Sequence, residues 1–315
     1  MADPRLSAGP LVRGGCVVFY VNLLDVSSNI TKVGGNFMDT GFHYFHLLKL
    51  KNILLVLCLS LICELGFSQV KMKVIDVPTR SGVTNRIIFL ATPEPKATLI
   101  LFVGGHGGLQ IFQGGSAKSL EGNFLFRSRI EFASHGFNVA VIDSPSDRMK
   151  FPFLYGFRHS EEHSEDIKEI IKFLQLQAKK PVWLIGTSRG AESVMSVGLK
   201  LQGLEGMQGL VLTSTILARD EDEKTNIPVQ LLPVNDLRLP VLIVHHELDI
   251  CKYSLYSDLP KLRSKLNPKA FTEILSIKGG TTEGNPCEGL SHHGFKGVES
   301  EVILKIVNWI TTQGK

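Results

Sequence analysis

Residues 181–191 read PVWLIGTSRGA, and this short stretch decides the fold. Residues 181–185 form an apolar run of the kind that builds a buried strand, and residues 191–202 are typical of a helix. Between them, residues 186–190 match the pattern Gly-x-Ser-x-Gly. In a strand–turn–helix setting the serine of this pattern occupies a sharp turn, and glycines flank it because the backbone is crowded there. We therefore predict that Ser188 is a nucleophile, against the simpler alternative of a glycine turn with an incidental serine.

From residue 69 onward the chain alternates between strands and helices. We expect strands at 70–77, 83–90, 97–103, 137–142, 181–185, 209–213, 240–244 and 271–277, and helices at 123–134, 160–177, 191–202 and 298–310. The first two strands predict a hairpin. The later alternation predicts βαβ units and a mostly parallel central sheet flanked by helices. Residues 214–239 are too few for a sizeable lid, so we expect one α/β domain over residues 69–315.

A serine hydroxyl needs a base and a group that orients the base. In a parallel sheet these partners come from the carboxyl ends of later strands. The strand at 240–244 runs into HHELD at 245–249, where Asp249 is the expected acid and Glu247 its rival. After the last strand, SHHGF at 291–295 offers two neighbouring histidines. The chain order serine, acid, histidine fits a nucleophile on a strand-to-helix turn.

Four segments together resemble the α/β-hydrolase superfamily, in particular its small, secreted, esterase-like members without a large cap. The segments are GGHGG at 104–108, GTSRG at 186–190, HHELD at 245–249 and HHGF at 292–295. The resemblance covers about residues 83–310. It implies that His293, which precedes Gly-Phe, is the base, with His292 as the alternative.

The resemblance also implies an oxyanion hole, a pair of backbone amides that bind the negative oxygen formed during the reaction. The first amide would be that of Arg189, directly after the nucleophile. The second would come from the glycine-rich turn, from Gly107, Gly108 or Leu109. Glycines suit this role because a backbone N–H must approach the substrate without a Cβ in the way.

These residues predict a serine hydrolase, most simply a carboxylic ester hydrolase that forms an acyl-enzyme intermediate. Ser188, His293 and Asp249 would form its triad, with a small-molecule or lipid-like ester as substrate and no cofactor. The same triad would also suit a peptidase, a thioesterase or a lipase. A non-catalytic binding protein with a hydrolase fold is the alternative from another class.

The cysteines and the charge balance exclude several other functions. The chain has 315 residues, five of them cysteine, and a formal net charge of +4 without a basic stripe, so we expect no nucleic-acid partner. Cys251 and Cys287 are disulfide candidates if the domain is exported. These cysteines, with the neighbouring histidines and Asp249, could instead hold zinc, but their spacing matches no common zinc motif. We therefore expect no metal.

The N-terminal region carries a pattern typical of a secretory signal. Lys49 and Lys51 precede the apolar run ILLVLCLSLIC at 53–63, and small residues at Gly66 and Ser68 suit a cut after Ser68. We therefore interpret residues 49–68 as a signal peptide and residues 1–48 as a non-native or disordered extension. The expected location is periplasmic or secreted, without stable membrane insertion after cleavage. The alternative is a membrane anchor at residues 47–67.

Overall fold

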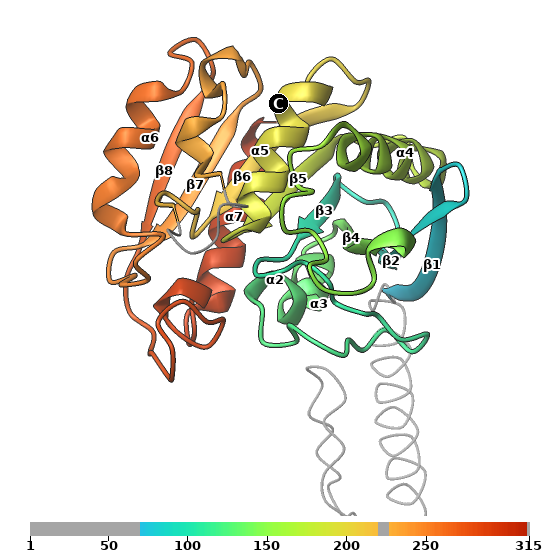
Figure 1. The fold of residues 1–315 in the computed structure, drawn as a ribbon, viewed down its shortest axis with the longest axis horizontal. Coiled ribbons are helices and arrows are strands. Elements are labelled where there is room, and N and C mark those ends of the chain that lie inside the picture. The colour runs from blue at the N-terminus through green and yellow to red at the C-terminus, as the bar shows by residue number, and fades with distance from the viewer. Residues whose placement is uncertain (1–69, 220–226, 314–315) are drawn as a thin grey trace, which may run out of the picture. The chain divides into compact units, whose positions relative to one another are not determined.

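The computed structural model describes residues 70–219 and 227–313, which build a single eight-stranded sheet with helices on both faces (Figure 1). The strands lie in the order β1-β2-β4-β3-β5-β6-β7-β8. Their bounds are Lys71–Arg80 (β1), Val83–Ala91 (β2), Thr98–Phe102 (β3), Asn138–Pro145 (β4), Val182–Thr187 (β5), Met207–Thr213 (β6), Val241–His246 (β7) and Thr272–Ile277 (β8). β1 and β2 form the antiparallel hairpin, β2 joins β4 antiparallel, and the remaining pairs are parallel.

The helices divide between the two faces of the sheet. One face packs against α4 (Glu161–Gln177), α5 (Gly190–Leu201) and α6 (Leu259–Lys265). The other packs against α2 (Phe124–Arg127), α3 (Arg129–Ser134) and α7 (Glu299–Gln313). Short 3-10 helices occupy Ser146–Arg148, Val229–Leu231, Val234–Asp236, Tyr256–Asp258 and His292–Gly294. The mostly parallel sheet flanked by helices is the architecture that the sequence predicts.

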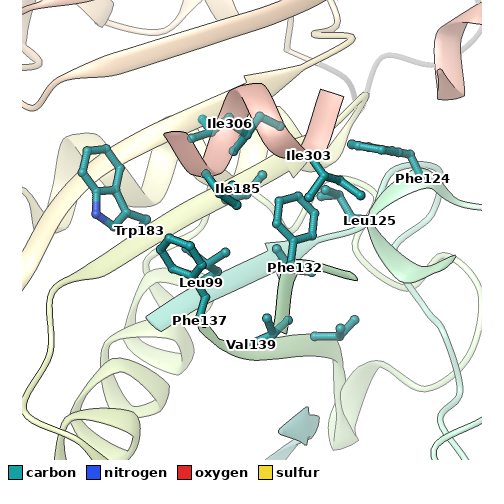
Figure 2. Close-up of a cluster of buried hydrophobic side chains, with 14 of the residues drawn as sticks. Leu99, Phe124, Leu125, Phe132, Phe137, Val139, Trp183, Ile185, Ile303 and Ile306 are labelled. Atoms are coloured by element: carbon teal, nitrogen blue, oxygen red, sulfur yellow. The ribbon is translucent and has the colours of Figure 1, made fainter. Parts of the chain in front are cut away.

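Buried strands explain why the central segments read as unbroken apolar runs. In β5, Trp183 and Ile185 point to the side of α7, where they pack with Ile303 and Ile306 (Figure 2). Leu184 between them and Val182 before them belong to the opposite cluster, under α4 and α5. Both faces of the strand are therefore covered, as in a parallel sheet with helices on each side.

The helix expected at 123–134 is in fact two helices. α2 begins after Asn123, whose side chain accepts a hydrogen bond from the Leu125 N–H. It ends at Ser128, whose φ and ψ of −91° and 0° differ from a regular helix, and α3 restarts there without a side-chain cap. Ile130 of α3 is 58% exposed. The break turns the chain so that Phe124 and Phe132 still reach the core.

The expectations for residues 1–48, for the signal-like segment 49–68 and for an anchor at 47–67 lie outside the described residues. Within the described ranges, no helix combines the length and the apolar character needed to cross a membrane.

Candidate active site

Ser188 lies on a tight turn between β5 and α5, and its backbone has the left-handed φ of +54° that non-glycine residues rarely adopt. Its N–H donates to the Thr213 carbonyl of β6 over 2.9 Å, which fixes the turn against the sheet. A Cβ at Gly186 would lie 2.4 Å from the Gly190 carbonyl oxygen, and one at Gly190 would lie 2.0 Å from the Phe102 oxygen. Both flanking positions therefore require glycine, for the crowding that the motif predicts.

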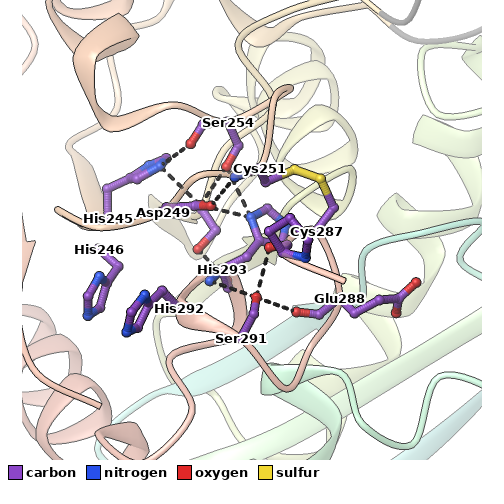
Figure 3. Close-up of polar contacts among 12 residues, drawn as sticks. His245, His246, Asp249, Cys251, Ser254, Cys287, Glu288, Ser291, His292 and His293 are labelled. Carbon is purple, nitrogen blue, oxygen red and sulfur yellow. Dashed lines mark hydrogen bonds and ion pairs between the residues drawn. A yellow bond between two sulfur atoms is a disulfide. The ribbon is translucent and has the colours of Figure 1, made fainter. Parts of the chain in front are cut away.

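Asp249 and His293 meet at the carboxyl end of β7. Asp249 Oδ2 lies 2.8 Å from His293 Nδ1, and both side chains are buried (Figure 3). The Cys251 N–H donates to Asp249 Oδ1 over 2.9 Å, so both carboxylate oxygens have partners. An acid that accepts the Nδ1 proton leaves Nε2 as the basic nitrogen of the ring.

Two further residues complete this network. The Ser254 hydroxyl donates to Asp249 Oδ2 over 2.8 Å and lies 3.0 Å from His293 Nδ1. His245 Nε2 donates to the Ser254 carbonyl at 2.7 Å and lies 3.4 Å from Asp249 Oδ2. Burial disfavours the charged carboxylate, but the hydrogen bonds from His245 and His293 outweigh it and hold the pKa of Asp249 well below its usual range. Asp249 is therefore an anion at neutral pH.

Ser188 and His293 line one cavity of about 590 Å³. His293 Nε2 is buried and has no hydrogen-bond partner among the described residues, Ser188 Oγ included. Catalytic hydrogen bonds of this kind are often long without substrate and tighten in the complex. The structure thus brings Ser188, the candidate nucleophile, and His293, the candidate base, to the same cavity.

The glycine-rich turn differs from the prediction. The Gly107 N–H donates to the Gly104 carbonyl over 3.2 Å, and the Gly108 N–H donates to His106 Nδ1 over 3.1 Å. The third candidate, the Leu109 N–H, donates to Asp143 Oδ1 at 2.8 Å. None of these three residues lines the cavity and each N–H donates within the protein, so the geometry does not favour Gly107 or Gly108 for an oxyanion hole.

Earlier residues of the same turn lie beside the nucleophile instead. Gly104, Gly105 and His106 line the cavity together with Ser188 and Arg189. A Cβ at Gly104 would lie 2.9 Å from Ser188 Cβ, so glycine is needed for the turn to approach the nucleophile this closely. Arg189 is in its expected place as the first residue after the nucleophile, at the N-terminus of α5.

Asp143, near the end of β4, shapes this turn, and no motif marks it in the sequence. Its two carboxylate oxygens accept from the N–H groups of Leu109, Gln110 and Ile111 over 2.8–3.1 Å. Burial raises the pKa of Asp143, and these backbone hydrogen bonds oppose the shift. The carboxyl group therefore draws three successive amides away from the cavity.

The alternative residues lie elsewhere. The ring of His292 stacks on that of His246 with centroids 4.3 Å apart, and His292 does not line the cavity (Figure 3). Glu247 lies 3.5 Å from Lys278 Nζ, outside the acid–base network. The geometry favours His293 over His292 and Asp249 over Glu247. In the described part of the chain, no group of three or more histidine, cysteine or acidic side chains has an arrangement that could hold a metal ion.

A disulfide joins Cys251, two residues after the acid, to Cys287 (Figure 3). Cys287 belongs to the loop between β8 and α7, and residues 283–285 and 287–290 of this loop form one wall of the cavity. Ser291 Oγ lies 2.8 Å from the carbonyl oxygens of both Pro286 and Glu288, which ties the end of the loop to the residue before the two histidines. The disulfide thus connects the acid segment to the cavity wall.

Apart from Cys287, the sequence predictions did not include the wall residues 283–290, nor did they include Ser254, and they considered His245 only as a possible zinc ligand. Their nearness to Asp249 and His293 is set by two loops of irregular backbone, and no motif marks them. Tyr155 and Tyr253 also line the cavity. The Arg189 guanidinium lies over the Tyr155 ring at 4.6 Å, so this tyrosine covers the start of α5.

Comparison with known proteins agrees with this architecture. An esterase of Pyrococcus furiosus is 13% identical, covers 77% of this chain and 91% of its own, and superposes with a TM-score of 0.55. An esterase of Rhizomucor miehei is 14% identical, with coverages of 79% and 84% and a TM-score of 0.55. A dienelactone hydrolase of Anabaena variabilis is 10% identical, with coverages of 76% and 95% and a TM-score of 0.53.

These likenesses and the sheet order show that the chain has the α/β-hydrolase fold, as the sequence resemblance implies. The described domain carries this fold without a sizeable lid. No protein-family model matches the sequence, and no curated protein matches it either. At these identities the structural likeness speaks for the fold alone.

Proposed function

We propose that this protein is a serine hydrolase that cleaves carboxylic esters through an acyl-enzyme intermediate. Ser188 Oγ attacks the ester carbonyl carbon while His293 Nε2 takes the hydroxyl proton. The same nitrogen then returns the proton to the departing alkoxide, and Ser188 remains acylated. Water then attacks the acyl carbon while His293 Nε2 takes its proton. His293 returns this proton to Ser188 Oγ, which releases the carboxylic acid and restores Ser188.

One observation carries the proposal. The hydrogen bond of 2.8 Å from His293 Nδ1 to Asp249 directs Nε2, which has no partner among the described residues, to the cavity that Ser188 lines. Asp249 keeps the Nδ1 tautomer and stabilises the imidazolium that forms when His293 takes the proton. A pure binding site has no need for an ionised acid, an oriented imidazole and a strained serine in this order.

The cavity supports an ester substrate of modest size. Its walls include the apolar side chains of Leu120, Phe124, Ile216 and Leu290, and its volume is about 590 Å³. Pockets of several hundred Å³ with apolar walls and few polar groups suit drug-sized ligands. We therefore place short and medium acyl esters ahead of long-chain lipids, amides and thioesters.

The test combines covalent labelling with a graded substrate panel. We expect a fluorophosphonate probe to label the native protein at Ser188, and Ser188→Ala to lose labelling and at least about 10³-fold of its rate on p-nitrophenyl butyrate. Parallel assays with a palmitate ester, a thioester and an anilide separate the lipase, thioesterase and peptidase alternatives. A folded native protein that takes up no probe and hydrolyses none of these substrates would refute the proposal and leave the binding protein.

We also propose that the domain works in an oxidising compartment, periplasmic or extracellular. The disulfide between Cys251 and Cys287 supports this, because such bonds persist mainly outside the cytosol. Sequencing the N-terminus of the natural mature protein tests it. A start directly after Ser68 agrees with export and signal removal, whereas a start within residues 1–30 contradicts the signal-peptide interpretation.

A further inference from the structure

Arg158 is a buried cation behind the active-site turn that the proposed chemistry does not use. It lies between β4 and α4 with only 2% of its surface exposed. Burial lowers the pKa of Arg158 to about 10, and nearby Glu192 opposes the shift, so the guanidinium is charged at neutral pH. A buried charge is costly unless its N–H groups are paired, so its partners show what it stabilises.

One side of the guanidinium is tied to the helix that follows the nucleophile. Arg158 Nη1 donates to Ser193 Oγ in α5 over 2.8 Å, and Ser193 Oγ lies 3.0 Å from His163 Nε2. Since Ser193 accepts from the arginine, its own proton goes to His163 Nε2, which requires a neutral ring. Burial lowers the pKa of His163 to about 3, which agrees with this direction. Arg158 is thereby held in one orientation.

The other side reaches the glycine-rich turn. Arg158 Nη2 donates to the Gly105 carbonyl over 3.1 Å and lies 3.3 Å from the Val103 carbonyl oxygen. A Cβ at Gly107 would lie 2.7 Å from Nη2 and 2.6 Å from a methyl carbon of Leu154. The left-handed φ of +79° and the room that Leu154 and Arg158 need thus explain glycine at 107 without any role in access to substrate.

The bond to Gly105 fixes the direction of the next amide. In a trans peptide the C=O and N–H point in opposite directions, so the His106 N–H points away from Arg158. The His106 carbonyl is held separately by the Leu154 N–H at 3.0 Å. His106 lines the cavity, and its N–H has no hydrogen-bond partner among the described residues.

We propose that Arg158 is a positioning residue that orients the Gly105–His106 peptide, so that the His106 N–H is the second donor to the oxyanion. This inference rests on the proposed serine hydrolase function. Arg158 touches neither substrate nor reacting atoms; it acts through the peptide, which it holds and polarises. The donor becomes important only when the carbonyl oxygen gains negative charge, so the loss of Arg158 lowers kcat and leaves KM nearly unchanged.

The test compares Arg158→Met with a matched arginine variant. We expect Arg158→Met to lower kcat on p-nitrophenyl butyrate by about 10²- to 10³-fold, the usual effect of losing an oxyanion donor, with KM within about threefold. Phenylboronic acid, whose adduct with Ser188 places an oxygen in the oxyanion position, should bind more weakly by a similar factor. Arg158→Lys should recover part of kcat, because an ammonium still reaches one carbonyl.

Arg129→Met is the control. Arg129 also donates to two backbone carbonyls, of Phe126 at 2.7 Å and Gly115 at 3.4 Å, but neither of these residues lines the cavity, whereas Gly105, the partner of Arg158, does. We expect it to lower stability and leave kcat within about threefold. If Arg158→Met does not fold, Arg158→Gln, which keeps a polar partner for Ser193, takes its place with the same expected kcat.

Two results would overturn the inference. A folded Arg158 variant with kcat within threefold of the active native protein, or a loss that appears only in KM, removes the positioning role and leaves the proposed function intact. A native protein that neither hydrolyses esters nor takes up a fluorophosphonate refutes the proposed function, and the role of Arg158 with it.

Discussion

Replacing Asp249 by asparagine exchanges one carboxylate oxygen for an NH₂ group at the centre of the acid–base network. The native Oδ2 accepts from His293 Nδ1 and Ser254 Oγ, and Oδ1 accepts from the Cys251 N–H. An asparagine must place an NH₂ group at one of these positions. At the Oδ2 position it faces the His293 N–H, and at the Oδ1 position it faces the Cys251 N–H, so in either orientation the NH₂ group meets another N–H donor instead of an acceptor.

The expected loss follows from this conflict. With NH₂ at the Oδ2 position, His293 avoids the clash by moving its proton to Nε2, the tautomer that cannot accept the Ser188 proton. Such a wrong tautomer lowers kcat by about 10⁴-fold in a serine triad, which corresponds to about 5.4 kcal/mol of activation free energy. We expect a loss of this size for Asp249→Asn, with no large change in the overall fold.

The assay measures kcat and KM on p-nitrophenyl butyrate, together with thermal unfolding of each variant. Glu247→Gln is the matched control, because Glu247 lies on the same segment but pairs with Lys278 outside the network. It should keep kcat within about twofold. If Asp249→Asn is folded and keeps more than a tenth of the native kcat, the assignment of Asp249 as the orienting acid is wrong.

Three further predictions concern stability. Gly190→Ala should lower the free energy of unfolding by about 3 kcal/mol or more, because its Cβ would lie 2.0 Å from a carbonyl oxygen of β3. Gly203→Ala is the control, since its Cβ would lie in open space, and it should change this free energy by no more than about 0.5 kcal/mol. Urea unfolding measures both variants. Burial lowers the pKa of His163 to about 3 in the folded protein. Between about pH 6.5 and 3, the His163 ring therefore binds a proton in the unfolded chain but not in the folded one. The unfolding free energy of the native protein should thus fall on acidification between about pH 6 and 4 more steeply than that of His163→Gln, by about 1.4 kcal/mol per pH unit. Replacing Cys251 and Cys287 together by serine should lower the free energy of unfolding by about 4 kcal/mol in the chain-entropy model, because the two cysteines are 36 residues apart. An unchanged melting temperature would contradict this expectation.

The nucleophile turn could be predicted from sequence because its requirements are local. Gly186 and Gly190 are needed by the backbone within two residues of Ser188 and by the neighbouring strand β3, and any such turn has the same crowding. The order of Ser188, Asp249 and His293 was equally accessible, since parallel strands end at one edge of the sheet. These features follow from patterns that a short window of sequence contains.

The oxyanion turn could not be predicted in the same way. Four of its five residues are glycine, so the sequence leaves the direction of every amide open. Asp143, 34 residues beyond Leu109, draws the later amides away, and Arg158, 53 residues beyond Gly105, fixes the earlier peptide. The motif, read locally, predicts Gly107 and Gly108 for this role, whereas the long-range contacts are the reason that we propose the earlier His106 amide instead.

The disulfide has a practical consequence for enzyme engineering. It anchors the loop between β8 and α7 at Cys287 and so divides the cavity wall into two segments. Residues 283–285 precede the anchor, and residues 288–290 follow it and lead to His293. If the proposed function holds, we expect side-chain libraries at 283–285 to reshape the cavity, while the crosslink and the bond of 2.9 Å from the Glu283 N–H to the Leu290 carbonyl keep His293 in place. We expect libraries at 288–290 to alter selectivity and turnover together, because these residues lead directly into the backbone of His293.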